Sequence, residues 1–401
     1  MTADHFIPFA VPSIEEDAIQ EVVETLRSGW ITTGQRSFQF EKEFQNYVRA
    51  QSALAVNSCT AALHLALSAL GIGAGDEVIT TPLTFCSTVN VIVQAGATPV
   101  LADIGPDLNI TPDAIRSRIT RHTRAIIPVH MAGLPCDMNA IWRLAQEYGL
   151  KVIEDAAHAV GATYQNVPIG GGKSDAVAFS FYANKNLTTG EGGMITSPYP
   201  DLINRMRILS LHGISRDAWR RYSKEGTWYY EVTECGFKYN MPDILAALGI
   251  HQLRKLDEMT MRRIAIAQTY NSAFSDIPEI ELPPDRSDSR HCWHLYMLRL
   301  NLSMLGGDRD EFFAEMRSEG VGCSVHFIPV QLHPYYRSLA DSDPCPQSLA
   351  EYPRLISIPL YPSLDDAEVS HVITAVKKVI ARLRMRQRVF VPEPCVQTLS
   401  R

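Results

Sequence analysis

The sequence predicts an α/β fold, an expectation that rests on chain length, composition and the alternation of hydrophobic segments. With 401 residues the chain exceeds what one hydrophobic core usually organises, so we expect a large domain and a smaller one. Hydrophobic residues make up 46% of the chain and charged residues 20%, as in ordinary globular proteins. From about residue 53 to 200, short apolar runs alternate with amphipathic stretches, which indicates a mostly parallel sheet with helical connections.

The apolar runs predict buried strands, and the stretches between them predict helices. Strands are expected at residues 53–56, 77–80, 99–103, 125–129, 151–154, 176–181 and 194–197. Helices are expected at residues 60–70, 84–94 and 137–148, the last one stopped by Gly149 as a C-terminal cap. A further helix opens at Thr111 with a hydroxyl cap, followed by a proline that needs no amide proton in the first turn.

The pattern changes beyond a long helix that is expected to begin near Pro242. It continues with a strand at residues 293–300, a helix at 308–319 and a final helix at 365–384. We therefore predict a large domain at residues 1–255, which includes the N-terminal segment, and a smaller α+β domain at residues 256–386. Residues 387–401 are expected to form a tail.

Charge and composition argue against several classes of function. The formal net charge of −7 is thinly spread, and no basic stripe indicates binding to nucleic acid. No segment has the uninterrupted apolar length that crosses a bilayer, and the first residues lack the pattern of a signal peptide. The eight cysteines form no C-x-x-C pair, so we expect reduced thiols, no metal site and a cytoplasmic location.

Two segments raise the question of a phosphate site. Residues 57–60 stand between a strand and a helix, where free backbone amides and the positive helix end favour an anion. Taken alone, these residues are better explained as a simple helix cap. The glycine-rich residues 71–75 follow a helix and precede a strand, the reverse of the order in a dinucleotide-binding loop, so they predict a turn.

Two further segments carry candidate chemistry. Asp155 ends a buried strand, at the edge where α/β sheets place ligands, and its carboxylate could pair with a protonated ring nitrogen or cap the next helix. His158 follows closely and could be structural. In residues 179–193 an apolar strand leads into a glycine-closed turn that contains Lys185, which in a pocket could lose its proton and form a Schiff base. Ser180, on the preceding strand, could offer a hydroxyl to a phosphate.

Taken together, these segments resemble the DegT/DnrJ/StrS family of sugar aminotransferases. The resemblance spans nearly the whole chain and rests on motifs in one order, at residues 28–34, 75–78, 154–158, 180–193, 236–241 and 357–360. It implies a pyridoxal-phosphate (PLP) enzyme with the aspartate-aminotransferase type of fold, fold type I. It also implies a homodimer whose active sites are shared between subunits.

The resemblance implies roles for individual residues around the cofactor. Lys185 would carry the cofactor as a Schiff base, Asp155 would pair with the ring nitrogen, and His158 would lie beside the ring hydroxyl. The phosphate would be held by Thr60, Ala61 and Ser180.

Five other positions complete the implied site. Phe85 would stack on the cofactor ring, and Asn240 would reach the phosphate from the partner subunit. Trp30, Thr32 and His326 match the substrate side, although Trp30 could be a buried anchor and His326 a satisfied polar residue. Many relatives have glycine or alanine where this chain has a cysteine at position 59.

The implied reaction transfers an amino group, with glutamate as donor, to a keto sugar linked to a nucleotide. Similarity of residues 30–34 and 217–222 to members that act at carbon 4 favours a 4-keto sugar, and carbon 3 stays open. A PLP-dependent sugar dehydratase of the same family is an alternative, but it has histidine where this chain has Lys185. A second alternative, a non-catalytic binding or regulatory protein, is disfavoured by the intact candidate residues.

Overall fold

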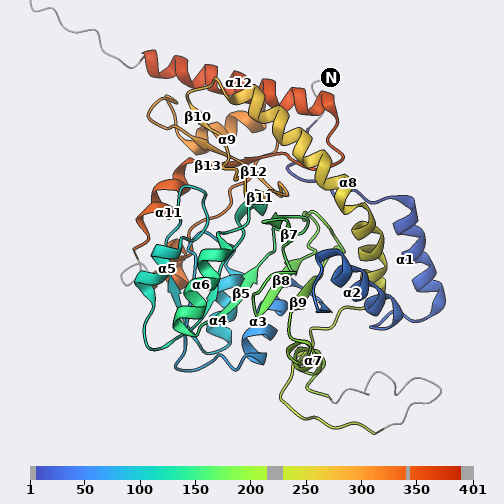
Figure 1. Ribbon diagram of the computed structural model, residues 1–401. Coiled ribbons are helices and arrows are strands. Elements are labelled where there is room, and N and C mark those ends of the chain that lie inside the picture. The colour runs from blue at the N-terminus through green and yellow to red at the C-terminus, as the bar shows by residue number, and fades with distance from the viewer. Residues whose placement is uncertain (1–5, 215–228, 340–343, 390–401) are drawn as a thin grey trace, which may run out of the picture.

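The computed structural model describes residues 6–214, 229–339 and 344–389, and a seven-stranded sheet lies at its centre (Figure 1). The strand order is β1-β9-β8-β5-β4-β2-β3. β9 runs antiparallel to both of its neighbours, and every other adjacent pair is parallel. The strands are β1 (Ser52–Val56), β2 (Glu77–Thr80), β3 (Thr98–Leu101), β4 (Thr123–Ile127), β5 (Lys151–Asp155), β8 (Ala176–Ser180) and β9 (Gly193–Ser197).

Both faces of this sheet are buried. Successive side chains of a strand point to opposite faces, and those on each face pack into a different hydrophobic cluster. In β1, Ala53 and Ala55 belong to one hydrophobic cluster, whereas Leu54 and Val56 belong to another. The first cluster includes residues of α2 (Gln35–Val48), α6 (Met138–Tyr148) and the start of α8 (Asp243–Phe274). The second includes residues of α3 (Cys59–Ala69), α4 (Ser87–Gln94) and α7 (Pro200–Leu209). Helices therefore cover the two faces, as the predicted α/β class requires.

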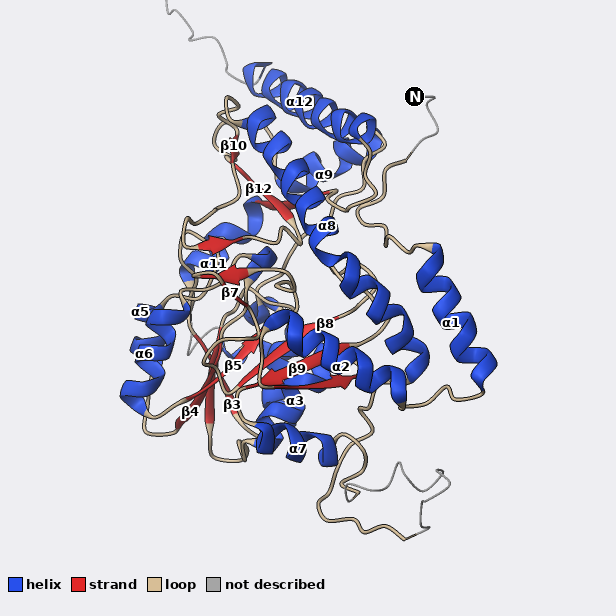
Figure 2. Ribbon diagram, turned by 45° about the vertical axis from the view of Figure 1, so that its right-hand side comes forward, coloured by secondary structure: helices blue, strands red, loops and turns tan. Residues whose placement is uncertain are grey.

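The helix α8 joins this layered part to a second core (Figure 2). Its 32 residues span about 48 Å at the usual helical rise. Leu253 and Leu256 pack in the core of the large sheet, whereas Ile266 and Tyr270 pack in the second core. That core surrounds an antiparallel sheet of β10 (Ile280–Glu281), β12 (Tyr296–Leu300) and β13 (Leu355–Ile358), with α9 (Arg309–Ser318) and α12 (Asp366–Val389) beside it.

The remaining elements are short or peripheral. α1 (Glu16–Ser28) packs along α8 on the outside of the molecule (Figure 1). A small sheet consists of β11 (Ser289–Arg290), β6 (Thr163–Tyr164) and β7 (Val167–Pro168). The other helices are α5 (Pro112–Arg118), α11 (Pro346–Glu351) and the 3₁₀ turns Met131–Gly133, Val330–Leu332, Pro334–Tyr336 and Tyr352–Arg354.

The fold class is confirmed, but several predicted boundaries are wrong. The helix expected at residues 84–94 begins only at Ser87, because the residues before it form a loop. The strands expected at 99–103 and 125–129 end at Leu101 and Ile127. The strand expected from residue 293 begins at Tyr296, because Trp293 has a left-handed backbone with φ of 50°, which a strand cannot contain.

The division into domains remains a prediction, since α8 runs without a break through residue 255. Ile7 is fully buried in the second core and forms a bridge with Val321, so the N-terminal segment packs away from the large sheet with which it was grouped. α12 continues to Val389, past the expected start of the tail, and residues 390–401 lie outside the described part. Among the described residues no helix is long and apolar enough to cross a membrane, and no cluster of side chains could hold a metal ion.

A buried carboxylate connects the start of α8 to the start of α2. Asp243 is 1% exposed, and its side chain accepts hydrogen bonds from the backbone amides of Gly34, Arg36 and Ser37 at 2.7, 3.1 and 2.9 Å. These amides belong to the first turn of α2 and its cap, where no carbonyl of the helix can accept from them. Asp243 therefore caps α2 from another part of the chain.

We expect Asp243→Ala to lower the free energy of unfolding by about 3 kcal/mol, because three amides lose a charged acceptor. The measurement is urea unfolding followed by circular dichroism. Asp310→Ala is the matched control: that side chain is 81% exposed and pairs with its neighbour Arg309, so its loss should cost less than about 0.5 kcal/mol. Equal stability of the two variants would contradict the capping role.

Candidate active site

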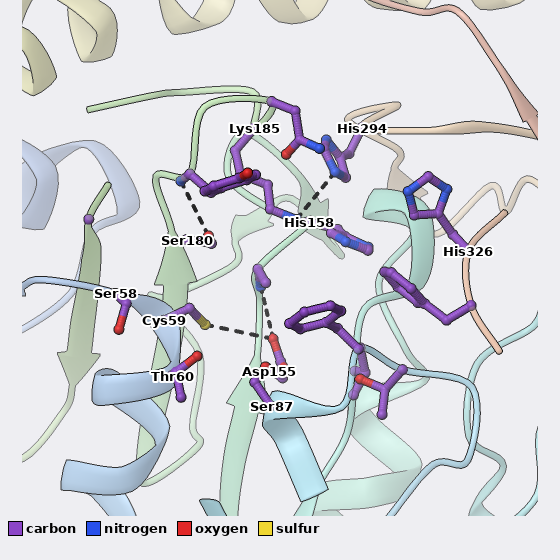
Figure 3. Close-up of a pocket in the computed structure, with 18 of the residues that line it drawn as sticks. Ser58, Cys59, Thr60, Ser87, Asp155, His158, Ser180, Lys185, His294 and His326 are labelled. Atoms are coloured by element: carbon purple, nitrogen blue, oxygen red, sulfur yellow. Dashed lines mark hydrogen bonds between the residues drawn. The ribbon is translucent and has the colours of Figure 1, made fainter. Parts of the chain in front are cut away.

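A cavity of about 490 Å³ lies at the carboxyl edge of the parallel strands (Figure 3). Parallel strands all end on the same side of a sheet, so their carboxyl ends lie along one edge. Such sheets bind their ligands at this edge. The segments that follow five strands reach the cavity, and the second core closes it with His294, His326 and Phe327. Its other lining residues are Ser58, Cys59, Thr60, Thr84, Phe85, Ser87, Val129, Asp155, Ala157, His158, Ser180, Tyr182, Asn184, Lys185, Glu191 and Gly192.

Lys185 stands in the turn that follows β8, where its amide donates to the carbonyl of Tyr182 at 2.9 Å. Its side chain reaches into the cavity, and its Nζ lies 3.4 Å from Nε2 of His294. Burial of the amino group lowers the pKa of Lys185 from 10.5 to about 8, although Cys59 and Asp155 act to raise it. The neutral, nucleophilic form of this amine is therefore far more abundant near neutral pH than that of an ordinary lysine.

Asp155 is the last residue of β5 and is 4% exposed. Its Oδ2 accepts a hydrogen bond from the Thr88 hydroxyl at 2.7 Å, and its Oδ1 accepts from the amide of Ala157 at 3.1 Å. The thiol of Cys59 lies 3.8 Å from Oδ1. Burial raises the pKa of Asp155, while the two hydrogen bonds and the positive charge of Lys185 oppose the rise. The carboxylate is thus held rigidly at the end of its strand.

Two of the predicted histidines line the cavity on the side of the second core. His158 is buried, and within the described residues its Nδ1 has no hydrogen-bond partner. Burial, followed by the charge of Lys185, holds the pKa of His158 well below its usual range. His326 accepts or donates through Nδ1 to the Ser357 hydroxyl at 2.9 Å, and burial lowers its pKa to about 3. Both rings are therefore neutral.

The N-terminus of α3 forms a cradle at the opposite side of the cavity. The Ser58 side chain caps α3 by accepting from the amide of Ala61 at 3.1 Å, and the amides of Cys59 and Thr60 have no protein acceptor among the described residues. β9 passes closely under this turn: a Cβ at Gly193 would lie 2.6 Å from the carbonyl carbon of Ser58. Free amides at a helix N-terminus are a typical phosphate site.

Comparison with known proteins identifies this arrangement. The sequence profile of the DegT/DnrJ/EryC1/StrS aminotransferase family matches residues 12–377. The chain belongs to this family. The aminotransferase is 52% identical over 382 residues to the spore coat polysaccharide biosynthesis protein SpsC of Bacillus subtilis, a match that covers 94% of the chain and 98% of the relative.

Solved structures agree with this membership. The Helicobacter pylori PseC, an aminotransferase involved in the biosynthesis of pseudoaminic acid, superposes with a TM-score of 0.88 at 28% identity and covers 94% of this chain and 100% of its own. Spr1654 of Streptococcus pneumoniae, provisionally named a sugar aminotransferase and solved in a PLP-form, has a TM-score of 0.86 at 33% identity, with coverage of 94% and 100%. Family and fold together confirm the predicted PLP-dependent sugar aminotransferase with fold type I.

The cavity of the aminotransferase brings together most of the residues that the sequence singled out. Lys185, Asp155, His158 and His326 line it with three further predicted residues, Thr60, Phe85 and Ser180. Phe85 is 59% exposed, and its ring centre lies 5.9 Å from that of Phe327. Ala61 is not among the lining residues, and its amide donates to the Ser58 hydroxyl that caps α3.

Three predicted residues lie together elsewhere on the chain. The indole of Trp30 donates to the carbonyl of Thr33 at 3.1 Å, and the carbonyl of Thr32 accepts from the amide of Asp243 at 3.1 Å. The Asn240 side chain donates to the Thr33 hydroxyl at 2.7 Å. Trp30, Thr32 and Asn240 therefore do not line the cavity of their own chain, and their roles remain predictions.

Among the residues that sequence reasoning missed, two form polar contacts with the Lys185 amine and the Asp155 carboxylate. Thr88, which donates a hydrogen bond to Asp155, lies in the first turn of α4. The sequence predicted this helix to begin at residue 84, so Thr88 was not recognised as a residue at its start. His294, which contacts Lys185, stands in the segment 293–300 that was predicted to be a strand, and no role was expected for it. The only local sign of a role for His294 was that a polar side chain stands just before a buried strand, and this sign is weak.

The lowered pKa of Lys185 predicts how the cofactor-free protein reacts with PLP. Because only the neutral amine attacks an aldehyde, the rate should rise with pH through a midpoint near 8, below the 10.5 of an ordinary lysine. Asp155→Asn should lower this midpoint, since the carboxylate acts to raise the pKa. Stopped-flow absorbance across a pH series measures both. A wild-type midpoint close to 10.5 would show that the amine is not buried as described.

Proposed function

We propose that this aminotransferase transfers the amino group of glutamate to a keto carbon of a nucleotide-linked hexose or pentose, carbon 4 being favoured, in amino-sugar biosynthesis. One observation carries the proposal: a buried amine, that of Lys185, and a buried carboxylate, that of Asp155, line one cavity of about 490 Å³. That volume is in the range of pockets for small molecules and cofactors.

The residues present fit PLP. The amides of Cys59 and Thr60, which have no acceptor in the described part of the chain, would hold its phosphate together with the Ser180 hydroxyl. Asp155 would pair with the ring nitrogen. Nδ1 of His158, which has no partner among residues that the structure describes, would contact the ring hydroxyl. When bound, PLP supplies an aldehyde for Schiff-base formation and a pyridinium ring that accepts an electron pair.

The chain's own side chains supply the acid–base chemistry. Lys185 would first hold the cofactor and, once released, take a proton from the amino donor and return one to the sugar carbon, which requires a pKa near the working pH. Asp155 would keep the ring nitrogen protonated, because its buried carboxylate is fixed by Thr88 and Ala157. The neutral rings of His158 and His326 add no positive charge that would compete with the ring nitrogen for Asp155.

Support for a sugar acceptor comes from the relatives. SpsC is named for the biosynthesis of a spore coat polysaccharide, and PseC for that of pseudoaminic acid. The preference for carbon 4 rests on residues 30–34 and 217–222, and the second segment lies outside the described residues. Glutamate as donor rests on the family resemblance. We also propose Trp30, Thr32 and His326 as substrate-binding residues.

The acceptor can be identified with the amine form of the enzyme. We expect a nucleotide-linked 4-keto sugar, from a panel that includes 3-keto isomers, to restore the absorbance of the aldehyde form. Lys185→Arg, which keeps the charge but cannot form the Schiff base, and Lys185→Ala should each lose at least about 1,000-fold in rate. Indifference to every nucleotide sugar, combined with turnover of simple keto acids, would contradict the proposed substrate.

We further propose a homodimer in which Asn240 completes the site of the partner chain. The side-chain contacts of Asn240 support this proposal: it does not line the cavity of its own chain, its side chain bonds to Thr33 and Lys238, and its backbone bridges Val56. The alternative is a local structural role before α8, whose loss would cost about 1 kcal/mol of stability and leave the cofactor bound.

Mixing two defective variants separates these readings. Lys185→Ala protein is combined with Asn240→Ala protein under conditions that exchange subunits. If sites are shared, each mixed dimer contains one site with both defects and one with neither, so activity should rise above that of either parent. Activity that stays at the average of the parents would mean that each chain uses its own Asn240, and would overturn the proposal.

A further inference from the structure

A third histidine of the cavity, His294, contacts the Lys185 amino group directly (Figure 3). We propose that His294 is a positioning residue: its Nε2 accepts a hydrogen bond from Lys185 and holds the amino group ready for proton transfer whenever the cofactor does not carry it. The inference rests on the proposed role of Lys185. It is carried by the 3.4 Å separation of the two nitrogens and by the hydrogen bonds on the far side of the His294 ring.

Those hydrogen bonds determine which ring nitrogen carries the proton. The Asn186 side chain donates through Nδ2 to the carbonyl of Cys292 at 3.0 Å, and because a carbonyl only accepts, the amide nitrogen must face it. The amide oxygen of Asn186 then faces Nδ1 of His294 at 3.2 Å, so Nδ1 carries the hydrogen. The lone pair of Nε2 is consequently free and lies toward Lys185.

The backbone around His294 holds the ring at this place. The left-handed conformation of Trp293 turns the chain just before β12, and the amide of His294 donates to the carbonyl of Ala132 at 2.9 Å. The buried guanidinium of Arg263 donates to the carbonyl of Leu360 at 2.7 Å and contacts those of Trp293 and His294 at 3.4 and 3.5 Å. His294 is 4% exposed, so its ring cannot swing into solvent without opening this region.

The charges nearby keep His294 an acceptor. Burial, followed by the positive charge of Lys185, holds the pKa of His294 well below its usual range, and His158, Arg263 and His326 act in the same direction. Opposite them, the pKa of Lys185 is raised by Cys59 and Asp155. The remaining titratable side chains that line the cavity are those of Tyr182 and Glu191. His294 thus stays neutral while Lys185 changes its protonation state.

The test compares two substitutions that keep different parts of the ring's function. Asn at position 294 can still donate to Asn186 but is too short to reach Lys185, whereas Gln places an acceptor at about the reach of Nε2. The cofactor-free variants are mixed with PLP across a pH series. We expect His294→Asn to lower the midpoint of the reaction by about 0.5 to 1 pH unit, because the ammonium loses an acceptor that favours it, and His294→Gln to retain most of the wild-type midpoint.

The same variants are then examined in the half-reaction with the amino donor. His294→Asn should slow proton transfer at least about tenfold, and His294→Gln should recover most of that loss. His291→Asn is the matched control: this neighbouring histidine is also buried, but it accepts from the amide of Trp293 and is not among the cavity residues. It should retain the wild-type midpoint. Circular dichroism verifies that all variants are folded.

Three results would overturn the inference: an unchanged midpoint in His294→Asn, equal losses in His294→Asn and His294→Gln, or the same shift in His291→Asn. Each would mean that His294 acts through packing alone. Failure of the proposed function is recognised separately, because Lys185→Ala protein would then still form the borohydride-stable adduct with PLP. An adduct at Lys185 with an unchanged midpoint in His294→Asn contradicts only the role of His294.

Discussion

Burial of the Lys185 amino group opposite the Asp155 carboxylate is the constraint on which the site depends. Each group favours the charged form of the other, but removal from water disfavours both charged forms. For the lysine, burial wins by enough to bring its pKa to about 8, so the neutral amine is available near neutral pH. For the aspartate, burial raises the pKa, and the hydrogen bonds from Thr88 and Ala157 limit that rise. The surrounding fold has to keep these two groups fixed and dry.

The sheet supplies that rigidity. β5 and β8 are adjacent and parallel, so Asp155 at the end of one and the turn after the other reach the same edge. β9 returns antiparallel beside β8, and its Gly193 permits the close approach to the start of α3 where the free amides lie. The second core then covers the edge with His294 and His326. Four chain segments that are distant in sequence thus meet in one cavity.

The sequence predicts the parts of this arrangement that depend on local pattern. Alternating apolar and amphipathic segments indicate the α/β class, and a lysine in a glycine-closed turn beyond a buried strand marks the centre of the site. Contacts across the two cores leave no local trace. His294 is close to Lys185 only because the second core closes over the sheet, and Trp293 interrupts an apolar run by a backbone conformation that composition does not reveal. The positions of Trp30, Thr32 and Asn240 depend on packing between α1, α2 and α8, and the resemblance alone could not show that these residues do not line the cavity of their own chain.

The central claim, that the buried amine of Lys185 carries PLP, is tested most directly by covalent mapping. Holoprotein is reduced with borohydride, digested, and its peptides are weighed by mass spectrometry. The account predicts that the mass of the reduced cofactor appears on the peptide that contains Lys185 and on no other lysine peptide. Cofactor mass on a different lysine, with the Lys185 peptide unmodified, would contradict it.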